Sequence, residues 1–257
     1  MIANYHTHTP RCCHASGTEE EYVRCALQAG MEILGFSDHA PYLFPDGFRS
    51  PFRMLPEELE DYVASVERVR KQYSEQIRIL LGAEAEFYPK YFADTVNMLK
   101  DQGIEYLILG QHMLYNEVEG IGTAGPTTDI TLLQQYCDQV IDGIYTGKFT
   151  YFAHPDIMNF VGAPGDYRKQ MSRICRAAKA CRMPLEINLL GLQLQRQYPN
   201  PVFWELAAEE GCQVVLGVDA HTAGALSDPT GEAMAREFCR KIGITPEEDV
   251  KLIPPTK

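Results

Sequence analysis

The feature that most constrains the fold of this 257-residue chain is the alternation of short apolar runs with longer amphipathic segments. Strands of a parallel sheet covered by helices are continuous apolar runs, and each needs a long, usually helical, connection to the next strand. Six such runs occur, at residues 31–37, 77–81, 103–109, 149–153, 184–187 and 213–218, and a seventh strand, at residues 4–9, is indicated by alternating side chains. Helical patterns follow them at residues 18–30, 57–73, 90–101, 129–146, 167–181, 202–210 and 231–242. The alternation predicts an α/β fold, a (β/α)7 barrel, with no linker that would divide residues 1–257 into separate domains.

The seven histidines are placed on this pattern in a way that predicts a metal site. His6 and His8 alternate along the first strand, so their side chains leave the same face. His14 follows the next turn, and the other four come after later apolar runs: His39, His112, His154 and His221. Barrels of this class build their active sites at the C-terminal ends of the strands. Imidazoles combined with a few carboxylates favour Zn²⁺, Fe²⁺ or Mn²⁺ over Mg²⁺ or Ca²⁺.

Composition excludes several classes of partner. The chain has 35 acidic and 23 basic residues and a formal net charge of −12, which disfavours nucleic acid and anionic membranes. It contains no apolar run of transmembrane length, and its N-terminus enters a strand at once, so we expect neither a membrane span nor a signal peptide. The eight cysteines form no CxxC pair and are expected to be reduced thiols of a cytoplasmic protein.

Cys12 and Cys13 are the cysteines that need separate treatment, because they lie between His8 and His14. A thiolate there could bind a soft metal ion. The alternative, which we favour, is a buried thiol packed beneath the site.

Several of the strand ends, taken together, resemble the motifs of the PHP (polymerase and histidinol phosphatase) superfamily. The segments are His6-x-His8-Thr9, Ser37-Asp38-His39, Gly82-x-Glu84, Gly110-x-His112, His154-Pro155-Asp156 and Gly217-x-Asp219-Ala220-His221. Within that superfamily the chain is most similar to the histidinol-phosphatase branch, through Cys12-x-His14-Ala15, Arg53 ahead of a helix with Tyr62, and Glu186-Ile187-Asn188. It departs from the usual motifs at Gln111 and Val218, where a serine is common.

The resemblance implies a distorted TIM-like barrel of the PHP type that holds three divalent transition-metal ions. His6, His8, Glu84 and Asp219 would bind the first ion. Glu84 would bridge to a second ion, completed by His112 and His154. His14, His39 and His221 would bind the third. A bridging carboxylate holds two ions roughly 3.5–4 Å apart, a spacing that suits displacement at phosphorus.

The implied reaction is hydrolysis of a small phosphate monoester by a metal-bridging hydroxide. The most specific expectation is conversion of L-histidinol phosphate to L-histidinol and phosphate, a step of histidine biosynthesis. The residues expected to carry the catalysis are Asp38, His39, Glu84, Asp219 and His221. Asp38 could orient an imidazole, which we favour, or protonate the leaving group, and Asp156 has the same two alternatives.

Three arginines are candidate phosphate ligands, because a guanidinium can hold a phosphate through two hydrogen bonds. Arg196 lies in the loop after the sixth strand and is the strongest candidate, while Arg53 and Arg168 are weaker ones. Glu86 could select a substrate ammonium group or be an ordinary solvated carboxylate.

Other functions remain as alternatives. The chain could hydrolyse another phosphorylated small molecule, or it could be an amidohydrolase. Amidohydrolases typically bridge their metals with a lysine, however, and Glu84 stands at that place here. A metal-binding protein without catalysis is the least favoured alternative, and a nuclease or polymerase-associated role is disfavoured by the acidic charge. The sequence leaves the oligomeric state open.

Overall fold

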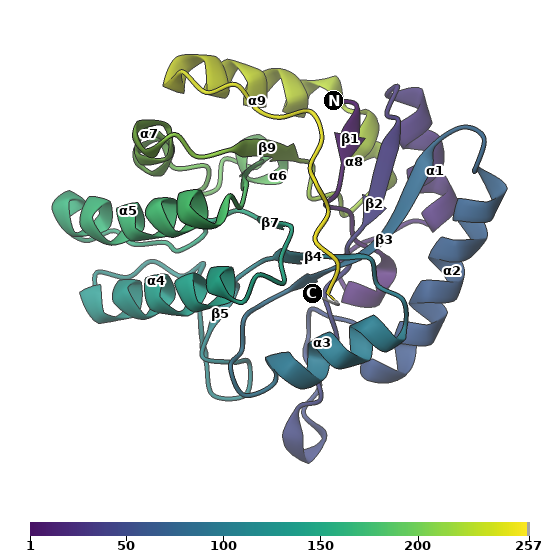
Figure 1. The fold of residues 1–257 in the computed structure, drawn as a ribbon, viewed down its shortest axis with the longest axis horizontal. Coiled ribbons are helices and arrows are strands. Elements are labelled where there is room, and N and C mark those ends of the chain that lie inside the picture. Colours follow the sequence, from purple (N-terminus) through teal and green to yellow (C-terminus); the bar gives the residue numbers. More distant parts are fainter. Residues whose placement is uncertain (256–257) are drawn as a thin grey trace.

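The computed structural model describes residues 1–255, and its centre is a parallel sheet of seven strands (Figure 1). The order of the strands in space follows their order in the chain. They are β1 (Ala3–Asn4), β2 (Ile33–Phe36), β3 (Arg78–Ala85), β4 (Tyr106–Leu109), β7 (Tyr151–Phe152), β8 (Leu185–Asn188) and β9 (Val214–Gly217). All six neighbouring pairs are parallel, which confirms the predicted topology.

The sheet closes on itself just beyond the ends of β1 and β9. Thr7 and Ala220 form a parallel bridge there. The backbone N–H of His8 donates to the carbonyl of Ala220 over 2.9 Å, and the N–H of Ala220 donates to the carbonyl of His6 over 3.1 Å. β1 ends at Asn4 and is therefore shorter than the predicted strand, so His6 and His8 lie just beyond it. The closure brings these two histidines beside the last motif of the chain. The result is the distorted TIM-like barrel that the alternation and the family resemblance predict.

Helices cover the outside of the barrel (Figure 1). They are α1 (Glu19–Gln28), α2 (Leu59–Gln72), α3 (Phe92–Asp101), α4 (Ile130–Tyr145), α5 (Pro164–Cys181), α7 (Pro201–Glu210) and α9 (Pro229–Ile242). The capping box expected at Thr18 is present, because Thr18 and Glu21 satisfy each other's backbone N–H groups. Within residues 1–255, no helix combines the length and the apolar character needed to cross a membrane.

Short elements that the sequence pattern did not predict lie in the connecting loops. Two of them are the helices α6 (Leu189–Gln193) and α8 (Ala223–Ser227), which directly follow β8 and the last motif. The Gly-rich loop after His112 contains a small antiparallel hairpin, β5 (Met113–Leu114) and β6 (Ile121–Gly122). Three single turns of 3-10 helix complete the set: η1 (Pro10–Cys12), η2 (Pro45–Gly47) and η3 (Pro56–Glu58).

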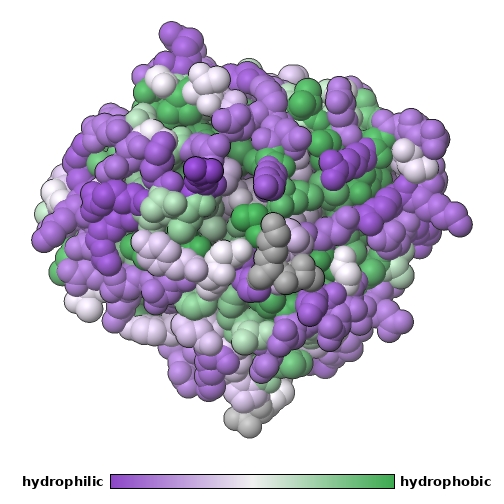
Figure 2. All heavy atoms as spheres, viewed as in Figure 1, coloured by the Kyte–Doolittle hydropathy of each residue, from purple (hydrophilic) through white to green (hydrophobic). Residues whose placement is uncertain are grey.

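The C-terminal segment after α9 closes the end of the barrel away from the histidines. Glu247 forms a bridge with Val215 near the start of β9, and the N–H of Ile253 donates to Thr150 Oγ1 just before β7. Val250 and Leu252 pack against the apolar side chains inside the barrel. Figure 1 shows this segment crossing the strands, and Figure 2 shows mainly hydrophilic residues around the periphery of that face. The sequence alone indicated only a short tail here.

Candidate metal centre

Glu84, near the C-terminal end of β3, lies at the centre of a cluster of histidines. Its Oε1 is 3.0 Å from His154 Nε2 and 3.7 Å from His112 Nε2. Its Oε2 is 3.0 Å from His39 Nδ1 and 3.6 Å from the Nε2 atoms of both His6 and His8. The two oxygens of one buried carboxylate thus face different histidines, which is the geometry required of a bridging ligand.

Asp219 forms the second acidic side of the cluster. Its Oδ1 is 3.1 Å from His8 Nε2 and 3.5 Å from His6 Nε2, while Asn188 Nδ2 donates to Oδ2 over 3.1 Å. The residue follows β9 with a φ of 55°, a left-handed conformation that aspartate tolerates better than most residues. His154 is also left-handed, with a φ of 34°. Backbone of this kind is concentrated at functional sites, where the surrounding structure enforces it.

Several buried atoms that face the centre have no hydrogen-bond partner among the residues that the structure describes. They include His6 Nε2, His8 Nε2, His39 Nδ1, His221 Nε2, Glu84 Oε2 and Asp219 Oδ1. A buried polar atom without a partner costs about 1–3 kcal/mol, so several of them at one point require an explanation. Imidazole nitrogens and carboxylate oxygens are the donors that divalent transition metals prefer. These residues therefore fit a centre that binds divalent metal ions.

The donor atoms fall into groups that overlap the sets implied by the family resemblance. His6, His8 and Asp219 place donor atoms within 4.8 Å of one another, and so do His14, His39 and His221. A further group joins Glu84 and His154 with His6, whereas the resemblance pairs them with His112. The structure therefore brings together all nine residues named as ligands.

The two cysteines beside the centre differ from each other. Cys12 is fully buried and shares a possible donor group with His8 and His221. Burial raises the pKa of its thiol, so without a bound ion it remains protonated. Cys13 is exposed, and its thiol is directed at the carbonyl of Arg11. Cys12 is thus the one of the two that lies against the centre.

In three histidines, the ring nitrogen Nδ1 lies within hydrogen-bonding distance of a buried carboxylate. Glu186 Oε2 is 2.9 Å from His6 Nδ1, Asp38 Oδ1 is 3.3 Å from His8 Nδ1, and Glu86 Oε1 is 2.9 Å from His112 Nδ1. Backbone carbonyls contact Nδ1 of His14 and of His221 in the same way. Such contacts set the tautomer and direct the other nitrogen toward a metal. The role of Glu186 was not predicted, although the alternation in Glu186-Ile187-Asn188 places it on one face with Asn188.

The structure distinguishes between the two alternatives for Asp38. Its carboxylate lies within hydrogen-bonding distance of four groups: His8 Nδ1, the N–H of Thr9, the hydroxyl of Thr9 and the N–H of His39. It is fully buried and is not part of the cavity wall. These contacts support the orienting role and leave no free oxygen for a leaving group.

Asp156 has a structural role at the start of α7. It accepts hydrogen bonds from the N–H of Asn200 and from Trp204 Nε1, at the start of α7. Burial raises its pKa to about 7.

The electrostatics of the centre favour cations. Burial alone would raise the pKa values of Glu84 and Asp219, but the surrounding histidines hold both well below their ordinary range. In return, the carboxylates outweigh burial and raise the pKa of His8 to about 9. His221 behaves differently, because burial and the neighbouring His8 lower its pKa to about 3. The centre therefore combines two ionised carboxylates with a neutral imidazole that is free to bind a metal.

A cavity of about 620 Å³ opens above the cluster. Five histidines, Glu84 and Asp219 form one side of its wall, and Phe52, Ile157, Leu190 and Leu194 contribute an apolar side. Arg196 and Tyr198 also line it, and Arg196 Nη1 donates to the hydroxyl of Tyr198 over 2.8 Å. A small ligand with one anionic and one apolar part matches this wall.

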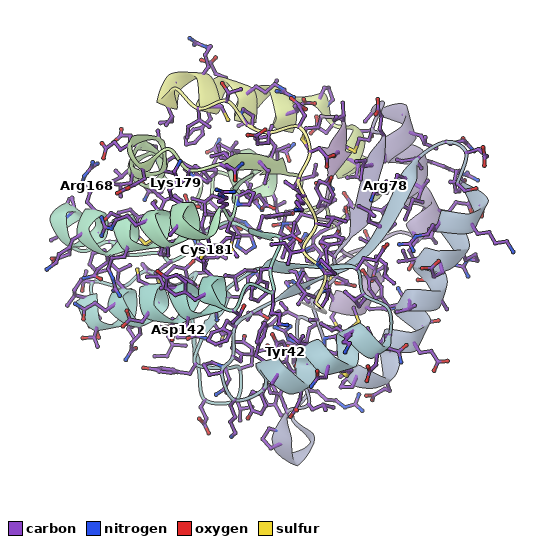
Figure 3. The ribbon with its side chains drawn as sticks, in the orientation of Figure 1. Tyr42, Arg78, Asp142, Arg168, Lys179 and Cys181 are labelled. Atoms are coloured by element: carbon purple, nitrogen blue, oxygen red, sulfur yellow. The ribbon has the colours of Figure 1, made fainter. Side chains whose placement is uncertain are left out.

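The other two arginines are not among the residues that line the cavity, and their contacts differ from those expected of phosphate ligands. Arg53 is 2% exposed and bonds to Glu86, to Glu117 and to the carbonyl of Ala40. Arg168 pairs with Glu205 and Glu209 of α7, and Figure 3 shows it on α5 at the outer edge of the molecule. Sequence placed both in loops or helix starts near the motifs but gave no information about these acidic partners.

Comparison with known proteins identifies the family. Residues 4–189 match the PHP domain family. A probable histidinol-phosphatase of Deinococcus radiodurans is 29% identical over 231 residues, with 87% of each chain covered. The histidinol-phosphatase of Bacillus subtilis is 27% identical, with 85% of this chain and 93% of the relative covered.

A solved structure supports the same fold. It is the histidinol phosphate phosphatase of Lactococcus lactis in complex with zinc, L-histidinol and phosphate. It superposes with a TM-score of 0.76 at 18% identity, covering 100% of this chain and 98% of the other. The family match over most of the chain and the curated relatives confirm the resemblance seen in the motifs. The chain therefore belongs to the PHP domain family, in its histidinol-phosphatase branch, and is a metal-dependent phosphatase.

Proposed function

We propose that the chain hydrolyses L-histidinol phosphate to L-histidinol and phosphate with three divalent transition-metal ions, Zn²⁺, Fe²⁺ or Mn²⁺. The observation that carries the proposal is the set of unpaired, buried donor atoms around Glu84 and Asp219, beneath a cavity that Arg196 also lines. The relatives named as histidinol-phosphatases support the choice of substrate. The zinc, L-histidinol and phosphate in the Lactococcus lactis structure agree with it.

The residues of the cluster would bind the three ions in three sets. His6, His8, Glu84 and Asp219 hold the first ion, Glu84 with His112 and His154 the second, and His14, His39 and His221 the third. When bound, the ions would lower the pKa of a water molecule and stabilise negative charge on the phosphoryl oxygens. Glu186 and Asp38 fix the rings of His6 and His8, so that their Nε2 atoms stay directed at the centre.

Arg196 and Tyr198, which line the cavity above the cluster, would bind the phosphate and the leaving group. Arg196 is exposed on the cavity wall, where it is the one arginine among the described residues, and it would approach a bound phosphate there. Tyr198 accepts a hydrogen bond from Arg196, which leaves its own O–H free to donate into the cavity. Burial raises the pKa of Tyr198, so it keeps that proton at neutral pH. The apolar wall would accommodate the organic part of the substrate.

Steady-state phosphate release from a panel of monoesters tests the proposal. The panel contains L-histidinol phosphate, nucleotides, sugar phosphates and phosphotyrosine, and the protein's metal content is measured in the same preparation. We expect kcat/KM for L-histidinol phosphate to exceed that of every other ester. Metal-loaded protein that releases phosphate faster from another ester would refute the substrate but keep the enzyme class.

A further inference from the structure

A buried charged network connects His112 to the loop before α2. Glu86 Oε1 contacts both His112 Nδ1 and Arg53 Nη2 at 2.9 Å. Arg53 Nε donates to Glu117 Oε1 over 2.6 Å, and Arg53 Nη1 donates to the carbonyl of Ala40 over 2.6 Å. Arg53 is 2% exposed and Glu86 is fully buried, so water does not compete for these contacts.

Glu86 is the group that fixes the orientation of the His112 ring. The side chain of His112 is 24% exposed, which makes it more open to solvent than His6, His8, His39 or His154. Its Nε2 lies 3.7 Å from Glu84 Oε1, too far for a hydrogen bond. Among the described residues, Glu86 is the one side chain that forms a hydrogen bond with this ring, through His112 Nδ1. Without it, the ring would be free to turn away from the centre.

Arg53 in turn holds Glu86 and the cavity wall. The second oxygen of Glu86 is buried without a hydrogen-bond partner in the described part of the chain. The negative charge of this buried carboxylate is therefore balanced by Arg53. The guanidinium also lies 4.7 Å from the ring of the adjacent Phe52 and 5.0 Å from that of Tyr42, which Figure 3 labels. Phe52 reaches into the cavity beside His39 and His112.

These contacts argue against the roles that the sequence suggested for the two residues. Neither Glu86 nor Arg53 lines the cavity. Glu86 therefore does not meet a substrate ammonium group, and Arg53 does not meet a phosphate.

We propose that Glu86 and Arg53 are positioning residues that set the tautomer and direction of His112 for metal binding. The inference rests on the proposed role of His112 as a metal ligand. It predicts that weakening the network lowers affinity for one ion and leaves the other positions intact.

Zn²⁺ binding to the metal-free full chain tests the proposal, measured by competition with a chromophoric chelator. The Glu86→Gln variant is expected to bind one Zn²⁺ about 10–100-fold more weakly, the range typical of lost outer contacts to a metal ligand. The thermal midpoint of the metal-free variant should stay close to that of the unchanged protein. Glu105→Gln is the matched control, because Glu105 also pairs with an arginine, Arg70, and forms no ion pair or hydrogen bond with a histidine among residues 1–255.

A double-mutant cycle with His112→Ala shows whether the effect passes through His112. We expect Glu86→Gln to weaken Zn²⁺ binding no further once His112 is removed. An equal loss in both backgrounds would overturn the proposal. So would unchanged affinity at all positions in folded Glu86→Gln, or a uniform loss that accompanies a lower thermal midpoint.

A second variant covers the case in which Glu86→Gln does not fold. Arg53→Lys keeps the positive charge but loses the planar set of donors, and we expect it to weaken the same single position. Wild-type Zn²⁺ affinity in folded Arg53→Lys would then overturn the proposal. Because no substrate is used, the result is independent of the proposed reaction, whose own failure would appear as zinc-loaded wild-type protein that releases no phosphate.

Discussion

At the residue scale, two glycines make room for the carboxylates of the centre. A Cβ on Gly110 would lie 1.9 Å from Glu84 Oε1, and a Cβ on Gly217 would lie 2.2 Å from Glu186 Oε2. Both contacts are far shorter than van der Waals distance. The glycines in the Gly-x-His and Gly-x-Asp segments are therefore required by the side chains opposite them, and not by turn geometry.

Replacing Gly110 tests this packing. In Gly110→Ala the new methyl group forces Glu84 out of its position, so we expect metal affinity and turnover to fall at least about tenfold. The matched control is Gly122→Ala, where the nearest atom to a new Cβ is Met113 Sδ at 3.6 Å. Metal content and phosphate release are measured for both. Wild-type values in Gly110→Ala would mean that Glu84 can move without cost.

The arginine assignments give a second prediction at this scale. Removing the side chain in Arg196→Ala should lower kcat/KM by about 10–100-fold, since a hydrogen bond to a charged group is worth roughly 1.5–3 kcal/mol. Arg168→Ala serves as the control, because this arginine pairs with Glu205 and Glu209 on the outer surface. Steady-state kinetics should show no change there. Equal effects in the two variants would contradict the assignment of Arg196 to the cavity wall.

The histidines and acids that follow strands could be predicted because their spacing and position in the alternation are visible in sequence. Their hydrogen-bond partners could not. Arg53 is the clearest example, since a loop arginine in sequence is usually exposed, and only the fold places it between Glu86 and Glu117. The identity of Glu186 as the partner of His6 depends in the same way on barrel closure.

At the scale of elements, Arg11 ties the loop of the first motif to two helices. Its guanidinium contacts Glu19 of α1, Asp61 of α2 and the hydroxyl of Thr9. Thr9 in turn donates to Asp38, which holds His8. The positions of α1 and α2 are therefore coupled to one wall of the centre.

The Arg11–Glu19 pair gives a prediction for pH dependence. Burial acts to raise the pKa of Glu19, but hydrogen bonds from Arg11 and Ser65 outweigh it and lower the pKa below 4.5. The unfolded chain therefore binds a proton more readily, so the pair stabilises the fold above pH 4.5 and this contribution is lost as pH falls through the folded value. We expect Glu19→Gln to cost about 1 kcal/mol at pH 7 and less at pH 4.

Urea unfolding at pH 7 and pH 4 measures this difference. The control is Glu67→Gln, which removes an exposed partner of Arg70 and should change stability little. A penalty for Glu19→Gln that grows toward pH 4 would contradict the account.

The order of the main elements could be predicted from alternation, but their details could not. β7 is only Tyr151–Phe152, because the segment pairs with its neighbours over few residues, whereas the apolar run is longer. α5 begins at Pro164 and not at residue 167, since proline fits the first turn of a helix.

At the scale of the whole molecule, the contacts between distant parts support a single domain. The last strand closes on the first, and the C-terminal segment joins the barrel at Val215 and Thr150. We propose that residues 1–257 unfold as one cooperative unit. The C-terminal contacts could not be predicted, because a short polar tail carries no periodic pattern that identifies its partner.

The single tryptophan makes this testable. Trp204 is fully buried in α7, so its fluorescence reports tertiary structure, whereas far-UV circular dichroism reports all helices. Coincident urea transitions of the metal-free protein are expected for one domain. Two separated transitions would show that the chain contains independently stable parts.

We infer that phosphate release depends on the divalent ions that the buried cluster binds. The most direct measurement removes all metal by chelation and returns Zn²⁺ or Mn²⁺ in steps, with phosphate release from L-histidinol phosphate and bound metal measured at each step. We expect the metal-free protein to be inactive and its activity to return as the cluster fills to about three ions per chain. Undiminished phosphate release by protein that contains no metal would contradict it.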